Sequence, residues 1–112
     1  MKKLVLAAAL LGCASPVFAG ATGFTLVNKT GAALSDLSIR RAETQDWKPL
    51  GAAPAAGARA SVDFKDPDCA FDIRATVAGS GPVIWARVNL CDVKSVSLNR
   101  DASAGAWVDY DQ

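Results

Sequence analysis

Acidic side chains and cysteines are the residues of this sequence that could do chemistry, since the 112 residues contain no histidine. Without an imidazole, Ser-His-Asp and Cys-His catalysis are excluded. Asp63, Asp66 and Asp68 form the densest group of carboxylates, and carboxylate oxygens are the ligands that Ca²⁺ prefers. The segment lacks the EF-hand spacing and its central glycine. We therefore expect solvated loop charges, with a calcium site at these three aspartates as the alternative.

No other combination of residues indicates a reaction. Glu43 is the only glutamate, and nothing places two carboxyl groups across a cleft, as glycoside hydrolysis requires. Gly79-Ser80-Gly81 is not followed by a lysine or a helix start, so it is a turn and not a phosphate loop. We predict that the protein is not an enzyme, has no catalytic residue and binds no cofactor.

Two of the three cysteines, Cys69 and Cys91, are predicted to form a disulfide, because two thiols in an exported domain usually pair. Closing the loop between Cys69 and Cys91 stabilises the fold by roughly 3 kcal/mol in the chain-entropy model. The alternatives are two buried thiols or a metal site, and two thiolates without histidine supply only half of a zinc site.

The clearest strand pair is predicted over 69–77 and 82–91, where apolar and polar residues alternate with the period of a half-buried strand. A four-residue loop would pair Val77 with Pro82, Ile73 with Ala86 and Phe71 with Val88. Cys69 would then lie opposite Leu90. The cysteines are therefore expected just outside the ladder, clamping the open end of the hairpin, unless a bulge intervenes.

The same register defines a polar outer face. It places Asp72 opposite Arg87, and the simplest interpretation is a cross-strand salt bridge worth about 0–1 kcal/mol. The alternative is an interaction surface for an envelope protein or glycan, because tryptophan and arginine are favoured at binding hot spots. The residues of this predicted surface are Asp72, Arg74, Trp85 and Arg87.

The remaining elements must position these residues, and the period-two pattern predicts strands throughout. Residues 24–27 and 37–39 are predicted to form a hairpin over 23–41, with a turn at Asn28–Gly31. A long loop covers 42–58, further strands are expected at 60–64 and 94–98, and 106–110 is expected to be a seventh strand or an ordered tail. This predicts an all-β domain, a small antiparallel β-sandwich or open barrel of six to seven strands with one disulfide.

The N-terminal segment has the form of a secretory signal peptide, predicted over 1–19. Lys2 and Lys3 precede an apolar run, and Ala19 suits a cleavage site; the run is too short to span a bilayer. Residues 20–112 would then be one β domain with no transmembrane helix, in the periplasm or secreted. Leu10-Leu11-Gly12-Cys13 also resembles a lipobox, so a lipid anchor at Cys13, and with it a membrane tether, is the alternative.

Charge excludes one class of partner. The chain carries a formal net charge of +1, and removing Lys2 and Lys3 with the signal turns this into −1. A nucleic-acid binder is expected to be clearly basic, so no nucleic acid is predicted as a partner.

The order of these motifs resembles a group of short exported bacterial proteins of unknown function. The resemblance rests on Phe24-x-x-x-Asn28-x-Thr30-Gly31, then Trp47, Cys69-x-x-Asp72-Ile73-Arg74 and Asn89-Leu90-Cys91, and it covers most of residues 23–98. Members are sometimes named for argininosuccinate lyase, a large helical enzyme whose proton-transfer residues have no counterpart here. The resemblance implies an extracytoplasmic domain and no activity.

Together these observations predict an exported, non-catalytic binding or structural accessory domain of the bacterial cell envelope. Two alternatives are a periplasmic lysozyme-inhibitor-like protein, since such inhibitors also carry a Ser-Gly motif before an aromatic strand, and a calcium-dependent adhesion module.

Overall fold

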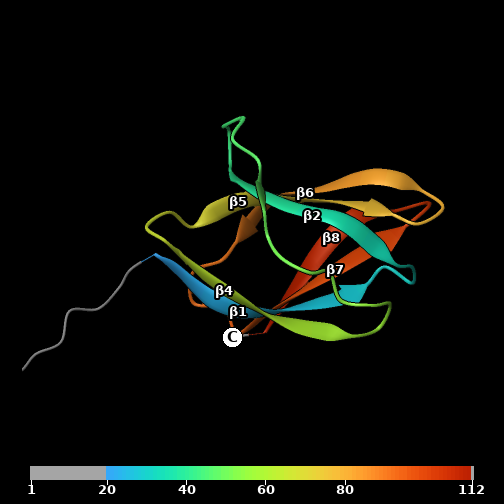
Figure 1. The fold of residues 1–112 in the computed structure, drawn as a ribbon, viewed down its shortest axis with the longest axis horizontal. Coiled ribbons are helices and arrows are strands. Elements are labelled where there is room, and N and C mark those ends of the chain that lie inside the picture. The colour runs from blue at the N-terminus through green and yellow to red at the C-terminus, as the bar shows by residue number, and fades with distance from the viewer. Residues whose placement is uncertain (1–19, 112) are drawn as a thin grey trace, which may run out of the picture.

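Two four-stranded sheets, stacked face to face, make up the protein (Figure 1). The computed structural model describes residues 20–111; the predicted signal peptide and Cys13 lie outside them. The strands are β1 (Ala21–Lys29), β2 (Leu34–Arg41), β3 (Lys48–Pro49), β4 (Arg59–Asp66), β5 (Ala70–Val77), β6 (Gly81–Asn89), β7 (Ser95–Asp101) and β8 (Gly105–Asp111). The all-β prediction is confirmed. The part of the chain that the structure describes contains no helix long and apolar enough to cross a membrane.

The chain passes back and forth between the sheets. One sheet, here the β1 sheet, has the order β4-β1-β7-β8, and the other, the β5 sheet, has the order β3-β2-β5-β6. β1 and β7 run parallel, with Thr25 opposite Ser95, and the other paired strands are antiparallel.

The predicted hairpin over 23–41 is wrong, because β1 and β2 belong to different sheets. Asn28, near the end of β1, is fully buried, and its amide group donates to the carbonyls of Ala32 (2.8 Å) and Pro54 (3.1 Å). Its Oδ1 accepts from the backbone and the hydroxyl of Thr30. The turn residues therefore carry the chain across the sandwich, and turn chemistry alone does not distinguish this from a hairpin.

The core lies between the sheets and follows the period-two alternation of the strands. Leu26, Ile73 and Leu98 are fully buried, and each side chain of this kind contributes about 1.5–3 kcal/mol on burial. Phe64 joins the two halves, with its ring edge-to-face against Phe24 at 6.3 Å and against Phe71 at 5.2 Å.

A β-bulge divides the β5–β6 hairpin into two registers. Phe71 pairs with Val88, as predicted, but Ile73 pairs with Trp85 and Val77 with Gly81. The extra residue lies near Arg87, whose φ of 54° is in the left-handed region. Between the bulge and the turn, the faces of β6 are therefore the reverse of those predicted.

The disulfide between Cys69 and Cys91 is present, with a Cα–Cα distance of 5.2 Å. Both cysteines lie just outside the ladder, and the Leu90 N–H donates to the Cys69 carbonyl at 2.9 Å. The disulfide clamps the open end of the hairpin, as predicted.

Candidate functional site

Trp85, the central residue of the predicted interaction surface, lies in the core and not on the surface. Its side chain is 2 % exposed, and its Nε1–H donates to the carbonyl of Asn99 in β7 at 2.8 Å. The outward position predicted for Trp85 is wrong because the bulge shifts the register between Trp85 and Val88. Ile84, the neighbour of Trp85 on β6, faces outward and is 46 % exposed.

Asp72 and Arg87 meet, but not as the predicted side-chain salt bridge. Asp72 is buried, and its Oδ1 accepts a hydrogen bond from the backbone N–H of Arg87 at 3.0 Å. Its Oδ2 pairs with Nε of Arg40 at 2.8 Å. The Arg87 guanidinium turns to Glu43, at 2.6 Å. The bulge presents the Arg87 backbone to Asp72, so the carboxylate takes its cation from β2.

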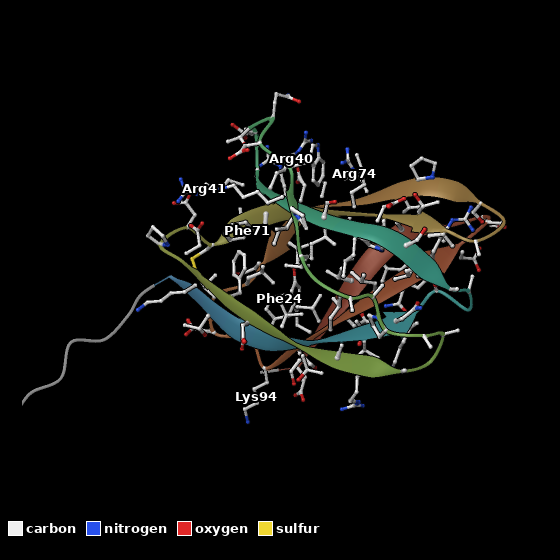
Figure 2. The ribbon with its side chains drawn as sticks, viewed as in Figure 1. Phe24, Arg40, Arg41, Phe71, Arg74 and Lys94 are labelled. Carbon is white, nitrogen blue, oxygen red and sulfur yellow. A yellow bond between two sulfur atoms is a disulfide. The ribbon has the colours of Figure 1, made fainter. Side chains whose placement is uncertain are left out.

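Trp47 supplies the aromatic side chain of the outer face. It lies in the loop between β2 and β3, and the guanidinium carbons of Arg40 and Arg74 lie 4.3 Å and 4.1 Å from the centroid of its ring. Figure 2 shows Arg40 and Arg74 on the side of the β5 sheet that faces away from Phe24. We call this surface the Trp47 face; its members are Arg40, Trp47, Asp72, Arg74 and Ile84.

The strand register explains why these side chains meet. Pairing of Ser38 with Pro49 and of Ile39 with Lys48 makes the loop return to β2, which places Trp47 over the sheet. Ser38 also pairs with Arg74, and Arg74 pairs with Ile84. Arg74 therefore lies in the middle of a row that crosses all four strands.

Asp72 holds this face together electrostatically. Burial raises the pKa of Asp72, but the hydrogen bonds from the Arg87 N–H and the Arg40 side chain, with the charges of both arginines, hold that pKa below its ordinary value. The carboxylate is thus ionised at neutral pH and neutralises Arg40.

Arg74 has a different electrostatic setting. Arg40, Arg41, Lys48 and Arg87, the other cations on or beside the face, each contact a carboxylate within 4 Å. Among residues 20–111, Arg74 has no such ion pair and no side-chain hydrogen bond; its contact is the indole ring of Trp47. Exposed Ile84 lies directly across β6 from it.

A cleft of about 250 Å³ opens around the edge of the same sheet, between β2–β3 and β4. Its floor is formed by Ile39, Phe64 and Phe71, and charged side chains form the rim. Because β3 has only two residues, it leaves this side of the sandwich less covered than the opposite side, where the Tyr110 hydroxyl accepts from the Asn89 N–H.

The three aspartates of the acidic cluster do not gather into one group within residues 20–111. Arg41 pairs with both Asp66 and Asp68 at 3.2 Å, and no group of three metal-ligating side chains occurs between residues 20 and 111. Asp63 is exposed on β4.

Sequence reasoning missed Trp47 and Arg40 as members of the face. The sequence predicts a long loop over 42–58 in which Trp47 folds back onto the core, whereas the Trp47 ring contacts Arg40 and Arg74 on the outer face. The signal in the sequence that could have identified them is their residue type, because tryptophan and arginine are enriched at binding surfaces. Their convergence depends on β3, and a strand of two residues is too short to show the period-two alternation.

Comparison with known proteins supports the fold alone. No family model matches the chain, and no curated protein matches it. The chain is similar to an NMR structure of a protein from Eubacterium rectale, with a TM-score of 0.59 and 12 % sequence identity over 88 % of this chain and 96 % of that chain.

Proposed function

We propose that the protein is an exported, non-catalytic binding domain of the bacterial cell envelope and that it binds its partner through the Trp47 face. The observation that carries the proposal is the contact of one tryptophan with two guanidinium groups on the outer face of a sheet. Tryptophan and arginine are the residues most enriched at binding hot spots.

The arrangement is also held in advance of binding. Asp72 holds the Arg40 guanidinium through an ion pair, and Arg40 and Arg74 both contact the Trp47 ring. A partner would therefore meet side chains that have already lost part of their freedom, and this lowers the entropic cost of association.

The disulfide supports the location, because disulfides persist in oxidising compartments and are rare in the cytosol. The intact mass of the protein recovered from cells tests processing. A mass beginning at Gly20 supports a free exported domain. A mass beginning at Cys13 with acyl chains supports a lipid tether, and a mass that includes residues 1–12 contradicts export by either route.

Two tryptophans, Trp47 over the β5 sheet and Trp107 on the β1 sheet, allow a matched test of the binding face. Trp47→Ala removes the aromatic residue of the Trp47 face, and Trp107→Ala removes an exposed tryptophan of the β1 sheet. We expect cross-linking to envelope components to be lost in Trp47→Ala and kept in Trp107→Ala, with both variants folded by circular dichroism. Equal cross-linking in both variants would show that the Trp47 face is not the binding surface.

A further inference from the structure

We infer that the Trp47 face recognises an acidic polypeptide segment, with Arg74 as the residue that binds its carboxylate. This inference rests on the proposed function and adds the chemical class of the partner. Within the residues described, each cation that neighbours the face already contacts a carboxylate, and Arg74 does not.

The contact with Trp47 prepares Arg74 for a planar anion. A guanidinium carbon 4.1 Å from the ring centroid is held by the π-face of the indole. The N–H groups at the rim of the guanidinium are not used by any described hydrogen bond. This fork of donors matches the two oxygens of a carboxylate, which makes the contact geometrically specific.

Asp72 does not compete for Arg74, although both residues lie on β5. One of its oxygens is bound by Arg40 Nε and the other by the Arg87 N–H. Its negative charge is therefore balanced by Arg40 and by the Arg87 N–H. The face retains one uncompensated positive charge, at Arg74.

A single uncompensated charge favours a carboxylate over a phosphate-rich ligand. Phosphate groups carry close to two negative charges at neutral pH, and polyanions gain affinity by contacting several cations. The flanks of Arg74 are apolar on one side, where Ile84 is 46 % exposed. An aspartate or glutamate beside an apolar residue in an extended chain satisfies both features.

The test is a titration of the full chain with two blocked peptides, acetyl-Leu-Glu-Leu-Ser-amide and its glutamine counterpart. The probes are the NMR signals of the Trp47 indole N–H and the Arg74 Nε–H. We expect the acidic peptide to saturate with a dissociation constant of about 1 mM or below, and the glutamine peptide to bind about tenfold more weakly.

The variants assign the effect to Arg74. Arg74→Gln should abolish binding of the acidic peptide, and Arg74→Lys should weaken it, since lysine keeps the charge but not the planar fork. Arg59→Gln, an exposed arginine of β4 in the other sheet, is the matched control and should bind as the unaltered protein does.

The inference would be overturned by equal binding of both peptides, by binding that survives in Arg74→Gln, or by tighter binding of inorganic phosphate titrated in parallel. Absence of saturation by about 10 mM would also overturn it. Each of these outcomes is distinguishable from failure of the proposed function, because the proposed function is tested by a different measurement, the loss of cross-linking in Trp47→Ala.

Discussion

The indole N–H of Trp85 donates to the backbone carbonyl of Asn99 at 2.8 Å and so joins the two sheets of the sandwich. Trp85 lies on β6 of the β5 sheet, and Asn99 lies on β7 of the β1 sheet. A buried indole needs an acceptor for its only polar group, and in this core the acceptor comes from the opposite layer.

Replacing Trp85 with Phe tests the value of this bond. The change removes the donor and part of the ring volume, and it leaves the Asn99 carbonyl without its partner. We expect the free energy of unfolding to fall by about 2–3 kcal/mol. Trp107→Phe, at an exposed position, should change it by less than about 0.5 kcal/mol. Urea unfolding followed by circular dichroism measures both, and equal values would contradict the structural role of Trp85.

Asn28 is expected to be one of the most sensitive polar positions. It is fully buried, and its side chain makes four hydrogen bonds. Asn28→Ala should lower the free energy of unfolding by about 2–4 kcal/mol, because it leaves buried backbone groups without partners. Thermal unfolding checks this, and Lys29→Ala at the exposed neighbouring position is the control. A loss below about 1 kcal/mol would show that water replaces the side chain.

Asn28→Asp should add a pH dependence of known sign. The new carboxyl group would be buried and face the carbonyls of Ala32 and Pro54, so its pKa in the folded state should rise. A raised folded pKa favours the protonated form, so stability relative to the unaltered protein should be greatest at low pH. It should begin to fall as pH rises above the unfolded pKa of about 4, and the fall should continue until pH passes the raised folded pKa. A difference that stays constant between about pH 3 and pH 7 would contradict this placement.

Asp72 should contribute to stability with the opposite sign. Its folded pKa lies below the ordinary value, so its contribution is present above the unfolded pKa of about 3.9 and is lost as pH falls through the folded pKa. Asp72→Asn should cost about 1–3 kcal/mol near neutral pH, and the cost should shrink below about pH 4. Urea midpoints across this range measure it. Asp63→Asn, an exposed carboxylate on β4, should show no comparable change.

Removal of the disulfide should loosen the open end of the β5–β6 hairpin. We expect the double change Cys69→Ser and Cys91→Ser to lower the free energy of unfolding by about 3 kcal/mol. Hydrogen exchange should increase first at Ala70 and Leu90, next to the cysteines, and later at the turn near Gly79. Uniform exchange along the hairpin would show that the disulfide does not act as a local clamp.

Local patterns predicted the strands of this protein well, and they failed where one residue changed the phase. The sequence predicts the pairing of Phe71 with Val88 correctly, because the predicted register holds between the cysteines and the bulge. Between the bulge and the turn, Trp85 faces the core and Ile84 faces outward, which is the reverse of what the alternation predicts. The sequence alternation of Ile84, Ala86 and Val88 is unbroken, and the spacing of three between buried Trp85 and buried Val88 appears only in the structure.

The binding face could be predicted only in part. Arg74 was placed correctly on the outer face of β5, because its neighbour Ile73 is strongly apolar and buried. Trp47 and Arg40 join it through contacts between distant parts of the chain. Strand order in a sandwich depends on such contacts, and they leave little trace in local residue spacing.

The parallel pairing of β1 with β7 places a limit on how the chain can reach its final form. β1 lies at the centre of its sheet, between β4 and β7, and β7 follows it in sequence only after five other strands. Assembly of this sheet therefore has to wait until β7 has been synthesised, and such long-range closure is intrinsically slow. A growing or truncated chain that ends before β7 would leave β1 with one edge open, exposed to pairing with another molecule.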